Sequence, residues 1–346
     1  MKNILDFTRK DLAVWFEDNG IRSFRAGQIS KWIHIRQADS FEAMTDLSKD
    51  LRKKLEENFY IPRLVVEEKM VSADTTEKFL FRLSDGLHIE SVLIPGKDHF
   101  TLCVSSQVGC AQNCRFCLTA RGGFIRNLNA SEIIAQVRDV RSYLIQKSID
   151  PLKLSNIVFM GMGEPLANYQ NLLKALETIT DSDYGFKFSP RHVTVSTSGL
   201  VPKITQLGLD TSVNLAVSLN ATTDELRSEL MPINNKYPLK QLLEACRTFT
   251  MKPRNKITFE YILMKGVNDS REDALRLVKL LSSIKAKVNL IPFNEYQEGG
   301  FKRPSPKAIS DFLQILLDRN FTAITRKSKG DDILAACGQL KAKLIP

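Results

Sequence analysis

The chain of 346 residues contains no uninterrupted apolar run that approaches the roughly 18–20 residues of a membrane-spanning helix. Its opening residues, Met1 to Phe7, include charged side chains and lack the apolar stretch of a secretory signal. Both absences argue against secretion and against a helical membrane anchor. We therefore expect a cytoplasmic protein without membrane contact.

Several familiar binding motifs are missing as well. There is no complete Gly-x-Gly-x-x-Gly fingerprint of a dinucleotide site, and no second Cys-x-x-Cys pair completes a four-cysteine zinc site. The four histidines form no recognisable constellation, and the sequence has no internal repeats or low-complexity segments. The chemistry of the chain must therefore be sought elsewhere, first in its cysteines and its charge.

The composition that is present is typical of a globular protein, with 43% apolar and 25% charged residues. The length allows one large α/β domain and a smaller one. The net charge is +10, and residues 251–346 hold 18 Lys or Arg against 10 Asp or Glu, so most of the surplus lies there. This surplus indicates either a polyanionic partner such as RNA or DNA or a solvated basic surface, and charge alone does not decide between them.

The six cysteines are Cys103, Cys110, Cys114, Cys117, Cys246 and Cys337. A chain of this length in a reducing cytosol does not depend on structural disulfides, so metal or redox chemistry is the better explanation for most of them. Cys246 lies in a predicted helix, and we expect it to be a small buried apolar residue.

The first 100 residues divide into two patterns. Residues 1–60 have the apolar spacing of helices, as where Leu47, Leu51 and Leu55 recur every fourth residue. Residues 62–95 change to the pattern of strands, with a hairpin turn at 84–86. We predict a helical accessory domain over 1–60 and a short antiparallel β-hairpin linker over 61–98.

From residue 100 onward, strands and helices alternate. The predicted strands are 100–106, 155–161, 192–198, 212–219, 256–263 and 287–292, and the predicted helices are 131–146, 169–180, 200–208, 238–250, 270–284 and 306–319. Six β–α units imply a parallel sheet with right-handed crossovers. Polar residues follow nearly every strand, which favours a partial (β/α)6 barrel over a doubly wound sheet. The predicted core domain is 99–346, with a C-terminal extension that carries Cys337.

Cys110, Cys114 and Cys117 follow the first core strand with the spacing Cys-x-x-x-Cys-x-x-Cys. Three thiolates can bind three irons of a [4Fe–4S] cube and leave the fourth iron open to a small molecule. A zinc knuckle is the alternative, and its fourth ligand would have to come from Cys103 or His99. The spacing favours the iron–sulfur site.

Polar groups also end several other predicted strands. Gly163 and Glu164 end the second, where glycine lets the backbone approach a ligand and a carboxylate can bind an amino group. The further candidate binding residues at strand ends are Ser196, Ser218, Leu219, Asn220 and Asn294. Each alone could serve as a helix cap or turn residue, but their shared edge of the sheet indicates one common ligand.

The three-cysteine spacing and the Gly-Glu-Pro segment after the second strand resemble the radical S-adenosylmethionine (radical SAM) superfamily, in which the open iron binds SAM. Other strings narrow the resemblance to the RlmN/Cfr family of radical SAM RNA methyltransferases, over essentially the full chain. They are IESVLIP with Glu90, CVSSQVGC with Cys103, CAQNCRFC, GFIRNLNASEI, MGMGEPLANY, LMPIN, GVND and DDILAACGQL with Cys337.

The resemblance implies a reaction with two SAM molecules per turnover. Cys337 would take a methyl group from the first SAM, and the second, bound at the [4Fe–4S] cluster of the three-cysteine motif, would yield a 5′-deoxyadenosyl radical that activates this methyl group. A covalent protein–RNA intermediate would follow. Cys103 would release the product by forming a disulfide with Cys337, and Glu90 would be the proton acceptor. The strand-end residues named above would contact SAM.

The resemblance also implies substrates and partners. The strings SQVGCAQNCRFC and MGMGEPLANYQNLL are more like the RlmN branch, which methylates C2 of adenosine, than the Cfr branch, which methylates C8. The expected targets are an adenosine of 23S rRNA in the peptidyl-transferase centre and the adenosine 3′ to the tRNA anticodon. The helical domain and the basic C-terminal third are expected to bind the RNA. The expected partners are an electron donor such as flavodoxin or ferredoxin and a thiol reductant, and a monomer is expected.

Three alternatives stay open at this point. A Cfr-like C8 methyltransferase would differ only in the carbon modified. A radical SAM enzyme for a protein or small molecule would not need Cys103, Cys337 and the basic surplus. A non-enzymatic zinc-containing RNA-binding module would not need six β–α units.

Overall fold

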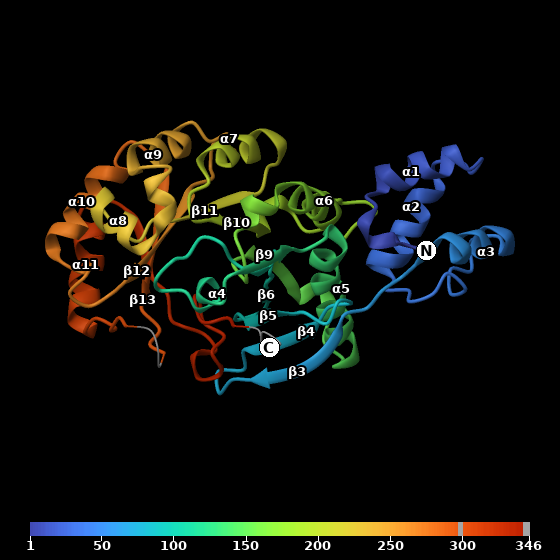
Figure 1. The fold of residues 1–346 in the computed structure, drawn as a ribbon, viewed down its shortest axis with the longest axis horizontal. Helices are drawn as coiled ribbons and strands as arrows, with labels where there is room; N and C mark the ends of the chain where they lie inside the picture. The colour runs from blue at the N-terminus through green and yellow to red at the C-terminus, as the bar shows by residue number, and fades with distance from the viewer. Residues whose placement is uncertain (297–299, 342–346) are drawn as a thin grey trace.

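The computed structural model describes residues 1–296 and 300–341. Its first sixty residues form a helical unit at one end of the molecule, drawn in blue in Figure 1. The elements are β1 (Lys2–Asn3), α1 (Arg9–Asp18), α2 (Arg25–Ser30), a π-helical turn (Lys31–Ile35), α3 (Lys49–Asn58) and β2 (Phe59–Tyr60). The N-terminus of α1 has a capping box, in which Thr8 and Asp11 satisfy each other's backbone N–H groups.

Buried arginine joins this unit to the rest of the chain. Arg138 of α5 (Ala130–Gln146) is completely buried and donates hydrogen bonds to the carbonyls of Ile33, Ala38 and Pro62. An ion pair between Arg63 and Asp139, at 2.7 Å, lies beside it. A guanidinium without water must find such acceptors, so these contacts fix the helical unit against α5.

One ten-stranded sheet forms the centre of the molecule, in the order β14-β13-β12-β11-β10-β9-β6-β5-β4-β3. Seven neighbouring strands are parallel: β6 (Phe100–Cys103), β9 (Leu154–Phe159), β10 (Val193–Thr197), β11 (Asn214–Ser218), β12 (Ile257–Leu263), β13 (Ala286–Pro292) and β14 (Thr322–Thr325). Three are antiparallel: β3 (Val65–Val71), β4 (Glu77–Arg82) and β5 (His88–Pro95). Strands β14 and β3 stay at opposite edges, so the barrel is open.

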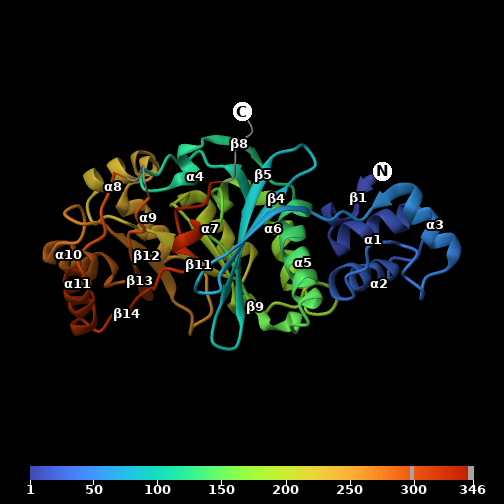
Figure 2. The same cartoon turned by 90° about the horizontal axis from the view of Figure 1, so that it is seen from below.

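Helices follow the parallel strands and cover the outside of the curved sheet, as Figures 1 and 2 show. They are α5, α6 (Tyr169–Thr180), α7 (Val201–Asp210), α8 (Asp224–Leu230), α9 (Leu239–Arg247), α10 (Arg271–Leu281) and α11 (Pro306–Asp318). Smaller elements are β7 (Gln107–Gly109), β8 (Phe124–Asn127), α4 (Leu118–Arg121) and 3-10 turns at Ile4–Asp6, Pro151–Lys153, Pro165–Asn168, Pro190–His192, Pro232–Asn235 and Asp331–Ile333. None of the helices in the described ranges has the length and apolar character to span a bilayer.

The partial barrel with an N-terminal helical unit, as predicted, is confirmed. Three features differ from the prediction. The strands within 62–95 are not a separate hairpin, because β5 pairs with β6 (Val92 opposite Cys103) and continues the core sheet. A seventh parallel strand, β14, was not predicted, because its four residues are mostly exposed and lack the apolar run of a buried strand. Helix α8, also unpredicted, is a short excursion before α9.

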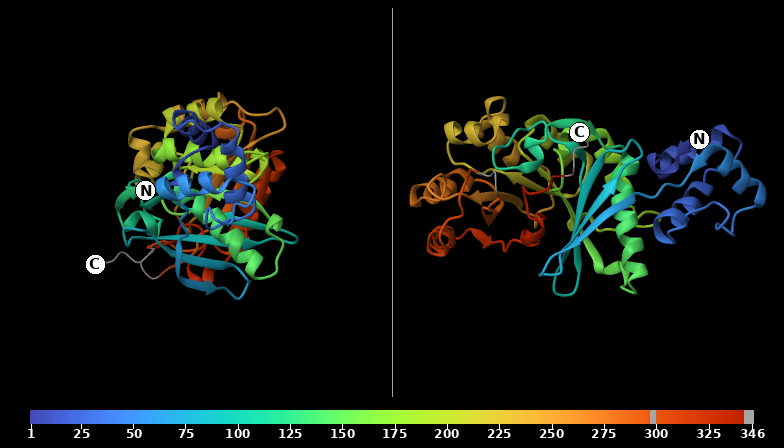
Figure 3. Two further views of the ribbon diagram at one scale, coloured as in Figure 1. Left: turned by 90° about the vertical axis from the view of Figure 1, so that its right-hand side faces the viewer. Right: turned by 60° about the horizontal axis from the view of Figure 1, so that its bottom comes forward.

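The C-terminal segment 327–341 returns to the three antiparallel strands rather than ending beside β14 (Figures 1 and 3). Asp332 accepts hydrogen bonds from the Ser72 hydroxyl at 2.5 Å and from the backbone of Ala73 at 3.0 Å. Lys78 of β4 donates to the carbonyl of Leu334 at 3.3 Å. We call residues 327–341 the C-terminal strap; its attachment to β3 and β4 determines where Cys337 lies.

Candidate active site

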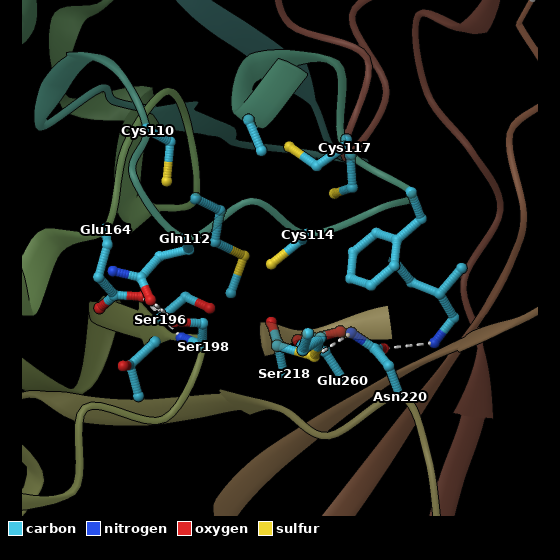
Figure 4. Close-up of a pocket in the computed structure, with 18 of the residues that line it drawn as sticks. Cys110, Gln112, Cys114, Cys117, Glu164, Ser196, Ser198, Ser218, Asn220 and Glu260 are labelled. Carbon is cyan, nitrogen blue, oxygen red and sulfur yellow. Dashed lines mark hydrogen bonds between the residues drawn. The ribbon is translucent and has the colours of Figure 1, made fainter. Parts of the chain in front are cut away.

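A cavity of about 150 Å³ opens at the carboxyl ends of the parallel strands, and we call it the upper cavity. Figure 4 shows its wall, with side chains from the loop after β7 and from several strand ends pointing into one space. The cysteines and polar residues that line it are Cys110, Gln112, Cys114, Cys117, Glu164, Ser196, Thr197, Ser198, Ser218, Asn220, Glu260, Arg326 and Cys337. Residues from opposite ends of the core domain thus meet here.

The loop that carries the three-cysteine motif is held by its backbone. The N–H of Cys110 donates to Gly123 at 2.7 Å, which continues the β7–β8 pairing, and the N–H of Arg115 donates to Leu230 at 3.0 Å. Asn113 takes a left-handed conformation (φ 52°), which turns the chain between the first two cysteines. Phe116 is buried in a small apolar cluster with Met231 and neighbouring residues. The loop therefore has a defined shape set by the protein alone.

The electrostatics of these thiols match what a multi-iron cluster requires of its ligands. Burial raises the pKa of Cys110 to about 12, and burial followed by the neighbouring thiols raises the pKa of Cys114 well above its ordinary value. Three mutually repelling thiols in one wall become stable thiolates only when cations neutralise them. Among the described residues no three His, Cys, Asp or Glu side chains converge on a single ion, whereas a cube presents its irons at separate corners. The donor set fits a [4Fe–4S] cluster.

Glu164 lines the upper cavity with a carboxylate, which is the group expected to bind an ammonium. Its carboxylate is buried and accepts hydrogen bonds from the N–H and the hydroxyl of Ser198, at 2.7 and 2.8 Å. Burial raises its pKa, and the Ser198 contacts oppose that rise. Gly163, before it, has φ 97°, and a Cβ there would lie 2.5 Å from the Gln107 side chain. Only glycine lets this loop pack against β7 and aim the carboxylate into the cavity.

The predicted SAM-binding residues divide into two groups. Gly163, Glu164, Ser196, Ser218 and Asn220 line the upper cavity. Leu219 and Asn294 do not. The backbone N–H of Leu219 donates to Glu260 and its carbonyl accepts from Arg227 at 3.1 Å, while its side chain is completely buried in the core. Asn294 is buried and accepts a hydrogen bond from Ser328.

Asn220 has a second task besides lining the cavity. Its side-chain oxygen accepts from the N–H of Ile262 at 2.9 Å, and its backbone carbonyl accepts from Asn268 at 2.8 Å. It therefore ties the end of β11 to the end of β12. The residue adopts φ 58°, which asparagine tolerates better than most residues.

The structure brings Cys337 to the cluster loop. The N–H of Leu118, directly after Cys117, donates to the carbonyl of Gly338 at 2.8 Å, and Thr119 donates to Leu340 at 2.7 Å. Cys337 itself is exposed to solvent, although many protein atoms surround its thiol, and this crowding raises its pKa. It lines the upper cavity and also a second one.

This second cavity, which we call the lower cavity, encloses about 190 Å³ toward the amino-terminal ends of β6, β9 and β10. Cys103, the last residue of β6, lines it and is buried. Burial raises the pKa of Cys103, and the nearby Cys337 raises it further. The two thiols that the sequence resemblance pairs therefore share one cavity wall, although neither is oxidised here.

Glu90 occupies a different place from the other predicted catalytic residues. It lines a third cavity, with Lys78, Leu334 and Lys341 among its neighbours. It forms an ion pair with Lys78 at 3.1 Å and accepts from the N–H of Lys341 at 2.8 Å. Burial raises its pKa, and the contacts with Lys78 lower it. The strap thus separates Glu90 from the upper cavity in this conformation.

Five polar residues that line the upper cavity were not among the predicted site residues: Gln112, Thr197, Ser198, Glu260 and Arg326. Glu260 of β12 is 6% exposed, receives a hydrogen bond from Asn289 at 2.9 Å on one oxygen, and has no partner for the other oxygen among the described residues. Burial raises its pKa, which the charge of Arg326 partly offsets. Glu260 could have been found from the sequence, because it is a charged residue within the apolar pattern of the predicted strand 256–263.

Comparison with known proteins identifies both parts of the chain. Residues 2–61 match the family model of the ribosomal RNA large subunit methyltransferase N-terminal domain, and residues 104–278 match that of the radical SAM superfamily. Proteins described as dual-specificity RNA methyltransferase RlmN are similar over nearly the whole chain. The protein from Desulfosudis oleivorans is 58% identical, covering 99% of this chain and 91% of its own, and that from Geotalea uraniireducens is 53% identical, covering 99% and 97%.

A solved structure agrees with these matches. The crystal structure of a radical SAM methyltransferase from Sphaerobacter thermophilus superposes with a TM-score of 0.91 at 42% identity, covering 99% of this chain and 100% of that one. The similarity therefore includes the helical unit, the barrel and the strap together.

Proposed function

The chain belongs to the RlmN family of radical SAM RNA methyltransferases, and on that premise we propose that it adds a methyl group to C2 of adenosine in both 23S rRNA and tRNA. The observation that carries this proposal is the meeting of the three-cysteine motif, Glu164 and Cys337 in one cavity. A SAM-binding group, a cluster-binding group and a methyl-accepting thiol are all required for such a reaction.

We assign cluster binding to Cys110, Cys114 and Cys117. A [4Fe–4S] cluster held there supplies, with SAM, the one-electron chemistry of the superfamily. Glu164 is suited to bind the SAM ammonium, because its carboxylate is fixed by Ser198 and faces the same cavity. Ser196 and Ser218 offer hydroxyl groups from neighbouring strand ends for the remaining polar groups of SAM.

Cys337 is proposed as the methyl acceptor and Cys103 as the thiol that releases the product. Their shared position on the lower cavity supports a disulfide between them after each turnover. Glu90 is proposed as the proton acceptor for the adenine. For that role it must exchange its contact with Lys341 for one with RNA, so residues at the end of the strap must shift when RNA binds.

RNA binding is proposed for the helical domain 1–60 and for the basic residues 251–346 of the core 99–346, with 61–98 between them. The helical domain is nearly balanced in charge, with 11 Lys or Arg against 10 Asp or Glu, but Arg22, Lys31 and Lys53 are exposed on it. The helical unit stacks guanidinium groups on aromatic rings, with Arg36 over Trp32 at 4.1 Å and Arg25 over Phe24 at 4.9 Å. Phe24 is 55% exposed, so a base can stack on it. Affinity for RNA should fall steeply with added salt.

The remaining partners follow from the chemistry. The reaction consumes electrons, so we propose flavodoxin or ferredoxin as the donor, together with a thiol reductant for the disulfide. We propose that the enzyme acts as a monomer in the cytoplasm, where thiols are kept reduced.

The experiment that tests this function is nucleoside analysis of RNA after incubation with the anaerobic enzyme, SAM and an electron donor. We expect 2-methyladenosine in both 23S rRNA and tRNA. The 8-methyl isomer would replace the C2 assignment with C8, and a product confined to rRNA would remove the dual specificity. A Cys103→Ala variant should accumulate protein covalently joined to RNA, and normal turnover by that variant would refute its release role.

A further inference from the structure

The walls of the lower cavity combine thiol chemistry with positive charge. Cys103 and Cys337 lie in its wall together with the side chains of Arg191 and Arg326. No aspartate or glutamate belongs to this wall. Within the described part of the chain, neither guanidinium has an ion pair or hydrogen-bond partner for its side chain. An anion entering this space would meet two guanidinium groups without an ion-pair partner; Arg191 faces no carboxylate here, whereas the charge of Arg326 also acts on Glu260 in the upper cavity.

The cavity also reaches the surface. Arg191, in the 3-10 turn before β10, is exposed, whereas Cys103 is only 7% exposed. Between them lie half-buried polar residues on the inner face of the strands, Asn156 and Thr194. His192 hydrogen-bonds Asn156 at 2.7 Å, and burial and Arg191 lower its pKa, so it contributes a polar edge rather than a charge at neutral pH. The lower cavity thus extends from the exposed Arg191 to the buried Cys103, with these polar residues along one side and apolar residues such as Ile94, Val158 and Leu340 in the rest of its wall.

The upper cavity offers no equivalent route to Cys103. Cys337 and Arg326 line both cavities, but Cys103 lines only the lower one. After methyl transfer the upper side holds the products of SAM and RNA under the proposed function. A reductant that reached the disulfide from above would have to wait for them to leave.

We propose that the lower cavity is the entry site for a small anionic thiol that reduces the Cys103–Cys337 disulfide, an inference that rests on the release step proposed above. The entering thiolate attacks the Cys103 sulfur, the disulfide bond breaks, and its electron pair leaves on the Cys337 sulfur, which then takes a proton. A second thiol attacks the mixed disulfide on Cys103 and departs with the first as a symmetrical disulfide. Two thiols thereby supply two electrons and two protons.

The direction of attack has a chemical advantage. The charge of Arg326 stabilises the thiolate form of both protein thiols, but Cys103 is buried whereas Cys337 is exposed to solvent. Attack on Cys103 makes Cys337 the leaving group, where both water and the guanidinium stabilise the departing thiolate, and a stabilised leaving thiolate departs faster. The residue that must accept the next methyl group is therefore the one freed first.

The test uses three thiols of the same length: 2-mercaptoethanesulfonate, 2-mercaptoethanol and cysteamine. The holoenzyme performs one turnover on RNA without thiol, and each thiol is then added. Alkylation and mass spectrometry follow the free Cys103 and Cys337 over time. Each rate is divided by the rate at which the same thiol reduces a small uncharged disulfide, which removes differences in thiol reactivity. We expect the sulfonate to be faster than the amine by roughly tenfold, falling as salt is added.

Two substitutions locate the entry. Arg191→Gln should remove much of the preference for the sulfonate, while Lys279→Gln, which removes a positive charge from the exposed face of α10, should not. Thr194→Phe should fill the lower cavity and slow reduction by all three thiols, while Thr194→Val should not. Occupying the upper cavity with S-adenosylhomocysteine should leave the wild-type rates unchanged.

The outcomes separate the two proposals. If no Cys103–Cys337 disulfide forms during the single turnover, the proposed release step fails. If the disulfide forms but its reduction is indifferent to thiol charge, or is blocked by S-adenosylhomocysteine, the lower entry is wrong. The thiol comparison needs only the wild-type enzyme, so a poorly folding Thr194→Phe variant does not remove the test.

Discussion

The upper and lower cavities are two ends of one barrel lumen, and they are built differently. In the upper cavity most polar side chains already have partners, such as Glu164 with Ser198 and Asn220 with Ile262. In the lower cavity the guanidinium groups of Arg191 and of Arg326, which lines both cavities, lack such partners among the described residues, and the principal reactive atom is a buried sulfur. The polar side chains of the upper cavity are held in place before a ligand binds, whereas the guanidinium groups of the lower cavity are free to bind an anion.

This difference reflects two kinds of chemistry. Binding SAM beside a cluster requires groups held in fixed positions, because a misplaced reacting atom lowers the rate sharply. Thiol exchange requires access and charge more than fixed geometry. Cys337 lines both cavities, so it can serve both kinds of chemistry in one cycle without a large displacement.

The largest effect is expected from removing a cluster ligand. Cys114→Ala should abolish RNA methylation, by roughly 10³-fold or more, because an incompletely held cluster is lost or inactive. Iron and sulfide analysis of the anaerobically purified variant measures this. Cys246→Ala, at a buried cysteine of α9 outside both cavities, should keep iron and sulfide. If the Cys114 variant kept a full cluster, the assignment of cluster binding to the upper cavity would be wrong.

The next largest effect should come from the support beneath the upper cavity. Arg227 is completely buried, and its guanidinium donates to the carbonyls of Ser198, Ser218 and Leu219. Arg227→Met removes these donors, which leaves the Leu219 carbonyl with only the N–H of Ala221, and should reduce the free energy of unfolding by about 3–5 kcal/mol. Urea unfolding measures the loss, and SAM affinity should fall with it.

A surface arginine provides the comparison for that variant. Arg247, at the end of α9, is exposed and pairs with Glu244 within the same helix. Arg247→Met should change stability by less than about 0.5 kcal/mol. Equal effects of the two substitutions would mean that the strand ends do not depend on the buried guanidinium.

A smaller effect is expected from neutralising the proposed ammonium-binding group. Glu164→Gln keeps the shape and an acceptor for Ser198 but removes the negative charge. SAM binding to the anaerobic holoenzyme should weaken by roughly tenfold, about 1.4 kcal/mol, with iron content unchanged. Titration calorimetry measures it. Unchanged affinity would move the ammonium site elsewhere in the upper cavity.

The smallest effect concerns Glu260 and depends on pH. Burial raises its pKa, so the folded protein keeps this proton to a higher pH than the unfolded chain. Wild-type stability therefore falls as pH rises above the ordinary value of 4.5 through the folded pKa, and Glu260→Gln lacks this loss. The variant should match the wild type near pH 4.5 and be the more stable of the two at pH 8.

Urea unfolding of the ligand-free protein at both pH values measures this difference. The glutamine can still accept the Asn289 hydrogen bond, so packing is preserved. A variant less stable than wild type at pH 8 would show that Arg326 and Lys287, whose charges lower the pKa of Glu260, outweigh its burial.

Much of the core could be predicted because its signals are local. The strands around Val193–Thr197 and Ile257–Leu263 fall within a few residues of their predicted limits, since an apolar run and its flanking turns are contiguous. Helix α10 begins at Ser270 because that residue and Asp273 form a capping box. Strand β14 was missed because four residues at an edge carry little apolar pattern.

The binding residues were predicted with uneven success for a related reason. A position at a strand end predicts that a residue is near the cavity but not which way its side chain points. Ser218 faces the cavity, while the next residue, Leu219, faces the core, as successive residues alternate along a strand. Glu90 and Asn294 do not line the upper cavity, because Glu90 pairs with Lys78 and both residues accept hydrogen bonds from the strap, at Lys341 and Ser328.

The sequence by itself determined the α/β alternation, the helical N-terminal unit and the three-cysteine loop, because each depends on spacing within a few residues. Only the tertiary structure decided that β3–β5 extend the core sheet, that the strap crosses them, and that Cys103 and Cys337 meet at a basic lower cavity. Those features depend on contacts such as Ser72 with Asp332, between residues far apart in the chain. Contacts between residues so far apart in the chain produce no periodic pattern in the sequence. Only the packing of the sheet determines which side chains share a cavity.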